Sequence, residues 1–124
     1  MATFLLLIPD LMFNVRVTDT LRALGHTPHD VADADALLAV AHNGASAIVI
    51  DSQARTPWQD VVHTLKSDPT TANIKILAFG PHVDVAAQRG AVGAGCDRVV
   101  TRGKFASEMP QLLQALVANI PNLE

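Results

Sequence analysis

The chain has 124 residues, of which 49% are hydrophobic and 17% charged, and its formal net charge is −3 at pH 7. This length suits one domain with a single core, and the composition excludes an intrinsically disordered chain. The longest apolar run is far shorter than the ~20 residues of a bilayer-spanning helix, and no basic stripe marks a nucleic-acid interface, so we expect neither a membrane nor a nucleic acid as partner.

Short apolar runs alternate with helix-like segments along the whole chain. Apolar runs bounded by turn residues predict buried strands, and longer segments closed by glycine predict helices. The expected strands are 3–8, 27–32, 46–50, 74–79 and 97–101. The expected helices are 11–24, 34–43, 57–67 with Thr56 as its cap, 83–94, and a last one that follows a cap at Ser107 and reaches Ile120.

Two of the predicted strands lead directly into a carboxylate, because the first is followed by Asp10 and the third by Asp51. Five strand–helix units with short connections predict an α/β fold with a parallel sheet and helices on both faces. Right-handed crossovers favour the strand order 2-1-3-4-5. In that order the first and third strands are neighbours, so we expect Asp10 and Asp51 to converge at the edge of the sheet where ligands bind.

Several stretches, in their order and spacing, carry a family resemblance over nearly the whole chain. They are Leu21-Arg22-Ala23-Leu24-Gly25-His26, Leu65-Lys66-Ser67-Asp68-Pro69, Asn73-Ile74-Lys75-Ile76-Leu77 and Ala91-Val92-Gly93-Ala94-Gly95-Cys96-Asp97. This arrangement resembles the receiver domain of bacterial response regulators, which has a flavodoxin-like fold. The resemblance implies that residues 1–124 form one receiver-like domain without an attached output domain.

The resemblance also implies roles for the residues near the two carboxylates. Asp51 occupies the position of the phospho-acceptor, and Asp10 that of an acid that binds Mg²⁺. Asp51 would also lie in the metal site, and the backbone carbonyl of Gln53 would supply a further ligand. In such a site the metal offsets charge on the incoming phosphoryl group while the aspartate acts as nucleophile. Asp10 equally suits a helix N-cap, and capping alone would explain it.

The same region departs from the family pattern at several positions. Pro9 replaces the first acid of a pair, Gly80 replaces a hydroxyl residue, and Arg102 replaces a lysine. The aromatic switch residue of the fifth strand falls on Val99. Fewer acids lower the affinity for Mg²⁺, and arginine does not reproduce the compact charge of lysine. We therefore expect Mg²⁺ binding to be weak at best and phosphorylation of Asp51 to be weak or absent.

Together with these departures, the resemblance implies a single-domain response-regulator-like protein of two-component phosphorelay signalling, without enzymatic activity, that acts as a pseudo-receiver through protein contacts. The expected partners are a histidine kinase or a downstream target, with a homodimer as a further option. The single cysteine, Cys96, excludes an internal disulfide and fits a cytoplasmic location. The alternative is a flavodoxin-like cofactor-binding protein or small enzyme, although the loop after the first strand lacks the hydroxyl and glycine residues that would cradle a phosphate.

Overall fold

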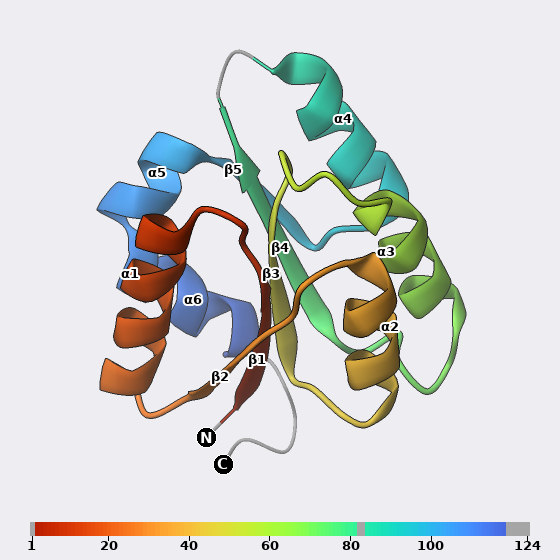
Figure 1. Ribbon diagram of the computed structural model, residues 1–124, viewed down its shortest axis with the longest axis horizontal. Coiled ribbons are helices and arrows are strands. Elements are labelled where there is room, and N and C mark those ends of the chain that lie inside the picture. Colours follow the sequence, from red (N-terminus) through yellow and green to blue (C-terminus); the bar gives the residue numbers. More distant parts are fainter. Residues whose placement is uncertain (1, 82–83, 119–124) are drawn as a thin grey trace.

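A computed structural model describes residues 2–81 and 84–118, which form five strands and six helices (Figure 1). In chain order these are β1 (Thr3–Leu7), α1 (Leu11–Ala23), β2 (Thr27–Asp30), α2 (Ala34–His42), β3 (Ala47–Asp51), α3 (Trp58–Ser67), β4 (Lys75–Gly80), α4 (Val85–Ala94), β5 (Arg98–Thr101), α5 (Arg102–Ser107) and α6 (Met109–Val117). None of these helices is long and apolar enough to cross a bilayer.

The five strands form one parallel sheet in the order β2-β1-β3-β4-β5, as predicted. The three central strands are almost entirely buried, which is why they appear in the sequence as continuous apolar runs. The edge strand β2 is largely exposed, whereas the edge strand β5 is mostly half-buried. Pro28, which cannot donate a backbone hydrogen bond, lies in the edge strand β2, where such a residue is tolerated.

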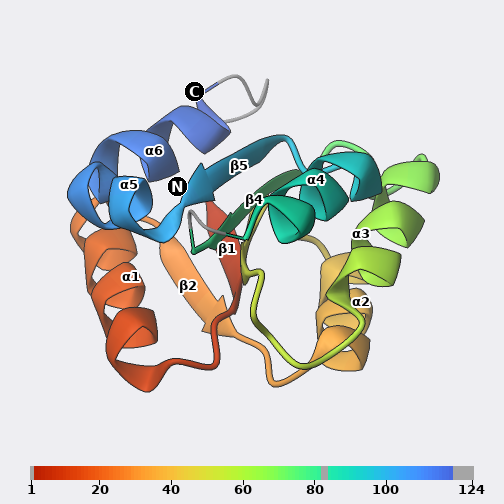
Figure 2. The same ribbon diagram turned by 90° about the horizontal axis from the view of Figure 1, so that it is seen from above.

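Helices cover both faces of the sheet (Figure 2). Alternate residues of each strand point to opposite faces, so Phe4, Leu6 and Phe79 pack in one core with residues of α1, α5 and α6. Leu5, Ile48 and neighbouring strand residues pack in a second core with residues of α2, α3 and α4. The two cores hold the central strands in a fixed position, and with them the edge of the sheet where β1 and β3 end.

The short helix α5 was not predicted, and two predicted helix caps are wrong. Ser107 ends α5 instead of starting the last helix, and its hydroxyl donates to the carbonyl of Lys104 at 3.2 Å. The third helix begins at Trp58, and the hydroxyl of Thr56 instead accepts a 2.9 Å hydrogen bond from the backbone nitrogen of Ala34. Val83 and Ile120, which were expected in helices, lie outside the described residues.

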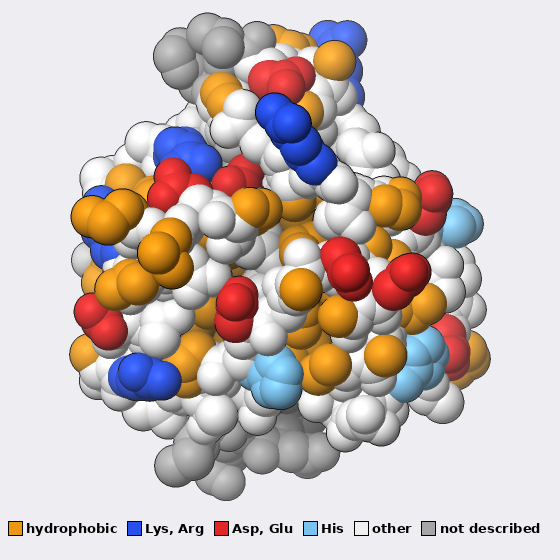
Figure 3. Space-filling view, viewed as in Figure 1, with side chains coloured by type: hydrophobic (Ala, Val, Ile, Leu, Met, Phe, Trp, Pro, Cys, Tyr) orange, Lys and Arg blue, Asp and Glu red, His pale blue; other side chains and the backbone are white. Residues whose placement is uncertain are grey.

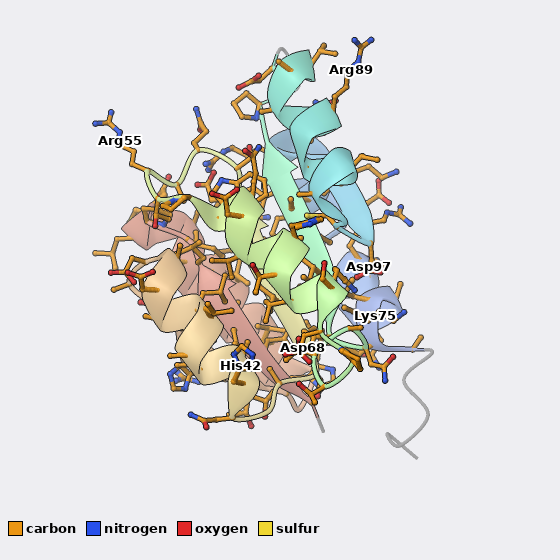
Figure 4. All side chains as sticks on the ribbon, turned by 90° about the vertical axis from the view of Figure 1, so that its right-hand side faces the viewer. His42, Arg55, Asp68, Lys75, Arg89 and Asp97 are labelled. Atoms are coloured by element: carbon orange, nitrogen blue, oxygen red, sulfur yellow. The ribbon has the colours of Figure 1, made fainter. Side chains whose placement is uncertain are left out.

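A charged network joins the end of α3 to β4 and β5 at the opposite edge of the sheet, where Figure 4 labels Asp97. Lys66 Nζ lies 2.8 Å from Asp97 Oδ2 and donates to the carbonyl of Ile74 at 2.7 Å. The same carboxylate oxygen accepts a 2.8 Å hydrogen bond from the backbone nitrogen of Ile76. Figure 4 also shows His42 and Asp68, which link the ends of α2 and α3, with 3.4 Å between His42 Nε2 and Asp68 Oδ2.

Substitution of Lys66 by methionine is expected to lower the free energy of unfolding by about 2 kcal/mol, because charge-assisted hydrogen bonds to a half-buried carboxylate and two carbonyls are lost together. Urea unfolding followed by the fluorescence of Trp58 measures this change. Lys75→Met is the matched control, since no ion pair involves Lys75 among the described residues, and its effect should stay below about 0.5 kcal/mol. Equal effects of the two substitutions would contradict the network.

Cys96 lies next to this network, half-buried against the core that α2, α3 and α4 cover. Burial, and secondarily the charge of Asp97, raises the pKa of its thiol to about 12. The thiol is therefore protonated at neutral pH and packs as a small apolar side chain, because the nucleophilic form of cysteine is the thiolate.

Candidate functional site

Two carboxylates meet at the carboxyl edge of the sheet because β1 and β3 are hydrogen-bonded neighbours. Asp51 is the last residue of β3, and only 3% of its surface is exposed. Its Oδ1 accepts a 2.9 Å hydrogen bond from the backbone nitrogen of Gln53. Asp10 is exposed and caps α1, where its Oδ1 accepts a 3.1 Å hydrogen bond from the backbone nitrogen of Phe13. Asp10 thus performs the capping role that the sequence allowed.

The guanidinium of Arg102 contacts both carboxylates. Its Nη2 lies 3.1 Å from Asp51 Oδ2, and its Nη1 lies 3.6 Å from Asp10 Oδ2. The two nitrogens belong to one planar group, so the guanidinium lies between the two acids. The three residues that the sequence placed at this edge are therefore brought together, with a cation of the chain itself among them.

Aromatic rings support the guanidinium from the side of the core. Its central carbon lies 4.8 Å from the ring centroid of Phe13 and 5.4 Å from that of Phe79, within the range of cation–π attraction. Phe105 packs against both rings, with its centroid 4.9 Å from that of Phe79. Buried aromatic side chains of β4 and α5 thus form part of the site as well as of the core.

The backbone of Arg102 is held by a direct transition from β5 to α5. Thr101 ends the strand, and Arg102 is the first residue of the helix. The hydroxyl of Thr101 caps that helix by accepting a 3.1 Å hydrogen bond from the backbone nitrogen of Lys104. Thr101 was not singled out from the sequence, because the helix that it caps has only six residues and shows no helical periodicity.

Gly80 lies beside Ser52 in the loop that follows β3. The backbone nitrogen of Ser52 donates to the carbonyl of Phe79 at 2.8 Å, which brings the residue after Asp51 against the end of β4. A side-chain carbon at Gly80 would overlap Ser52 Oγ and would lie 3.3 Å from Ser52 Cβ. The serine hydroxyl therefore occupies the space that a side chain of residue 80 would need.

The remaining predicted site residues lie around the two carboxylates. Pro9 and Gln53 are exposed and line one shallow hollow together with Leu7, Ala32 and Thr56. Arg55, in the loop between β3 and α3, projects away from the body of the molecule (Figure 4). Among residues 2–81 and 84–118, the cationic side chain that forms an ion pair with Asp51 is that of Arg102.

Several solved structures that superpose on the chain are receiver domains or response regulators. The chain superposes on the receiver domain of a signal transduction histidine kinase of Syntrophus aciditrophicus with a TM-score of 0.86 at 13% identity, covering 100% of this chain and 96% of that one. The chemotaxis response regulator CheY4 of Vibrio cholerae gives 0.80 at 18% identity, covering 94% and 98%. The chain has the receiver-domain fold. No protein-family model and no curated protein sequence matches it.

A third receiver domain, from a sensor histidine kinase of Pseudomonas aeruginosa, has a magnesium ion coordinated in its active-site cleft. The chain superposes on it with a TM-score of 0.81 at 17% identity, covering 95% of this chain and 98% of that one. The side chains of the present receiver fold do not match the needs of such an ion. Mg²⁺ requires several oxygen ligands in near-octahedral geometry, but Pro9 offers no side-chain oxygen and both carboxylates contact Arg102. Among the described residues, no three His, Cys, Asp or Glu side chains come together as a metal site.

Proposed function

We propose that this chain is a receiver-type module of two-component signalling that acts as a pseudo-receiver through protein contacts, with weak or absent phosphorylation of Asp51 and weak binding of Mg²⁺. The proposal is supported by the receiver-domain fold together with one local observation. A buried aspartate stands at the end of β3, but its carboxylate is ion-paired to Arg102 instead of being open to a phosphoryl donor.

Both oxygens of the Asp51 carboxylate already have partners. Oδ1 accepts from the backbone nitrogen of Gln53, and Oδ2 accepts from Arg102. A carboxylate is a nucleophile only through an oxygen whose lone pair reaches the phosphorus atom. Acceptance of a phosphoryl group would require the ion pair with Arg102 to open first, and this supports slow or absent modification.

The residues around Asp51 also offer few contacts that could distinguish two states. Gly80 has no side chain to follow a phosphoryl group, and Val99 is half-buried in the core with no ring to move. A ligand shifts a conformational equilibrium only through its differential interactions with the two states. Partner binding that is insensitive to the state of Asp51 follows from this arrangement.

The proposed contact face is formed by α4, β5 and the last helix, α6. Val85 and Val92 of α4 are 51% and 62% exposed, and they line a shallow groove with Val99 of β5 and Arg89. Figure 4 shows Arg89 projecting outward from α4. A second apolar patch, which the sequence did not suggest, consists of Leu11, Met12 and Val15 on α1, and Figure 3 shows hydrophobic side chains gathered over this helix. Exposed apolar side chains in groups are typical of protein contact surfaces, so a signalling partner or a second copy of the chain suits either face.

The test is whether Asp51 governs association. Asp51→Asn is expected to change the self-association constant, measured by analytical ultracentrifugation, by less than tenfold, equivalent to ~1.4 kcal/mol. Asp60→Asn, an exposed position in the first turn of α3, is the control. In parallel, the intact mass of the wild type after incubation with Mg²⁺ and acetyl phosphate should show little phosphorylated protein. A larger effect of Asp51→Asn, or stoichiometric phosphorylation, would contradict the pseudo-receiver role.

The cofactor-binding alternative is disfavoured by the start of α1. Asp10 already caps this helix through the amide of Phe13, and its negative charge repels a phosphate at the position where a flavin nucleotide would need free amides. A flavin absorbance spectrum in the purified protein would favour the alternative.

A further inference from the structure

We infer that Arg102 is a resident counter-cation whose guanidinium takes the place of a divalent metal between Asp10 and Asp51 and keeps that metal out. The assignment concerns the local charges alone, and it stands whether or not the chain signals.

The first support is the geometry of the contacts. One guanidinium reaches the carboxylate at the end of β3 and the carboxylate that caps α1 through two different nitrogens, at 3.1 Å and 3.6 Å. A Mg²⁺ ion bound by carboxylate oxygens sits about 2.1 Å from each of them. A Mg²⁺ ion that bridged the two acids would therefore need the space that the Arg102 guanidinium occupies. The guanidinium must leave before the ion can enter.

The second support is that Arg102 is held in place independently of the acids. The central carbon of its guanidinium lies 4.8 Å from the ring centroid of Phe13 and 5.4 Å from that of Phe79, so cation–π attraction holds it there. Its backbone starts α5 directly after β5, so no flexible loop lets it swing away. A divalent ion must therefore overcome the ring contacts as well as the ion pairs.

The third support is the charge that remains. Two carboxylates and one guanidinium leave one net negative charge at this edge, whereas Mg²⁺ sites in proteins gather several oxygen ligands. Residue 9 is a proline and adds no carboxylate. Removal of the arginine charge would double the net negative charge and vacate the position between the acids.

The experiment measures Mg²⁺ binding by isothermal titration calorimetry with MgCl₂ as the only ligand. Arg102→Gln is expected to bind Mg²⁺ at least tenfold more tightly than the wild type, a difference of ~1.4 kcal/mol. Arg98→Gln is the matched control, because Arg98 is exposed at the other end of β5 and should leave the affinity unchanged. Adding Asp51→Asn to Arg102→Gln should abolish the gain.

A gain of less than tenfold in Arg102→Gln, or wild-type binding in the low micromolar range, would overturn the assignment. Circular dichroism establishes that the variant is folded. If it is not, Arg102→Lys takes its place, since the ammonium lacks the planar fork that reaches both acids, and the same tenfold threshold applies. A gain of less than tenfold in Arg102→Gln would overturn the counter-cation assignment alone, whereas low-micromolar binding by the wild type would also contradict the weak Mg²⁺ binding of the proposed function. Failure of the Asp51→Asn association test would leave the counter-cation assignment standing.

Discussion

Replacement of Phe79 by alanine is expected to lower the free energy of unfolding by about 3–5 kcal/mol. Phe79 is fully buried at the end of β4, where its ring packs against Phe13 and Phe105. The substitution removes the ring from the core and leaves a cavity beneath Arg102, whose guanidinium also loses a cation–π contact. Domains of this size have total stabilities of about 5–15 kcal/mol, so the variant would be close to unfolding.

Urea denaturation followed through Trp58, the single tryptophan of the chain, measures this loss. Phe13→Ala is the comparison, because Phe13 packs in the same cluster but is only partly buried and should lose less than half as much. A loss below about 1.5 kcal/mol for Phe79→Ala would mean that the aromatic cluster is not packed as described.

The second large effect is expected from a double-mutant cycle between Arg102 and Asp51, with a coupling free energy of about 1.5–3 kcal/mol. The Asp51 side chain is only 4% exposed, so Arg102→Gln alone leaves a buried negative charge without its cation. Removal of one partner of a buried pair is more destabilising than removal of both. Asp51→Asn should therefore recover part of the stability that Arg102→Gln loses.

The same cycle between Arg102 and Asp10 should give less than about 1 kcal/mol, because that carboxylate is 47% exposed and solvent screens the pair. Both cycles require only the urea unfolding curves of the single and double variants. Equal coupling energies for the two acids would show that Arg102 does not favour Asp51, and a coupling near zero for Asp51 would show that the ion pair is absent in solution.

The sheet could be predicted from the sequence because its central strands are buried on both faces and therefore appear as unbroken apolar runs that stop at Asp10 and Asp51. Helix α5 could not, since six residues are too few to show helical periodicity, and its existence depends on the Thr101 cap and on the burial of Phe105. The sequence predicts Ser107 as a helix cap because this residue precedes a clearly periodic segment, and no local pattern shows that it ends the short helix α5.

At the site, the sequence indicated which residues would gather at one edge of the sheet, but not their mutual geometry. The position of Arg102 between two acids depends on strand pairing, on the direct β5–α5 transition and on two rings that are distant in sequence. The approach of Ser52 to Gly80 is likewise a contact between separate loops. Contacts between residues far apart in the sequence cannot be predicted from their spacing along the chain. The sequence therefore shows that residue 80 lacks a hydroxyl, but not that Ser52 lies against it.

The contact between Ser52 and Gly80 makes the two positions epistatic. A side chain at residue 80 does not fit beside the present rotamer of Ser52, since a carbon added at Gly80 overlaps the serine hydroxyl. A hydroxyl residue at position 80 is therefore tolerated only after Ser52 has become glycine or its side chain has turned away. A mutational path from this chain toward a hydroxyl residue at position 80 therefore either changes residue 52 first or turns the Ser52 hydroxyl into a different rotamer, and the order of substitutions decides which intermediates remain well packed.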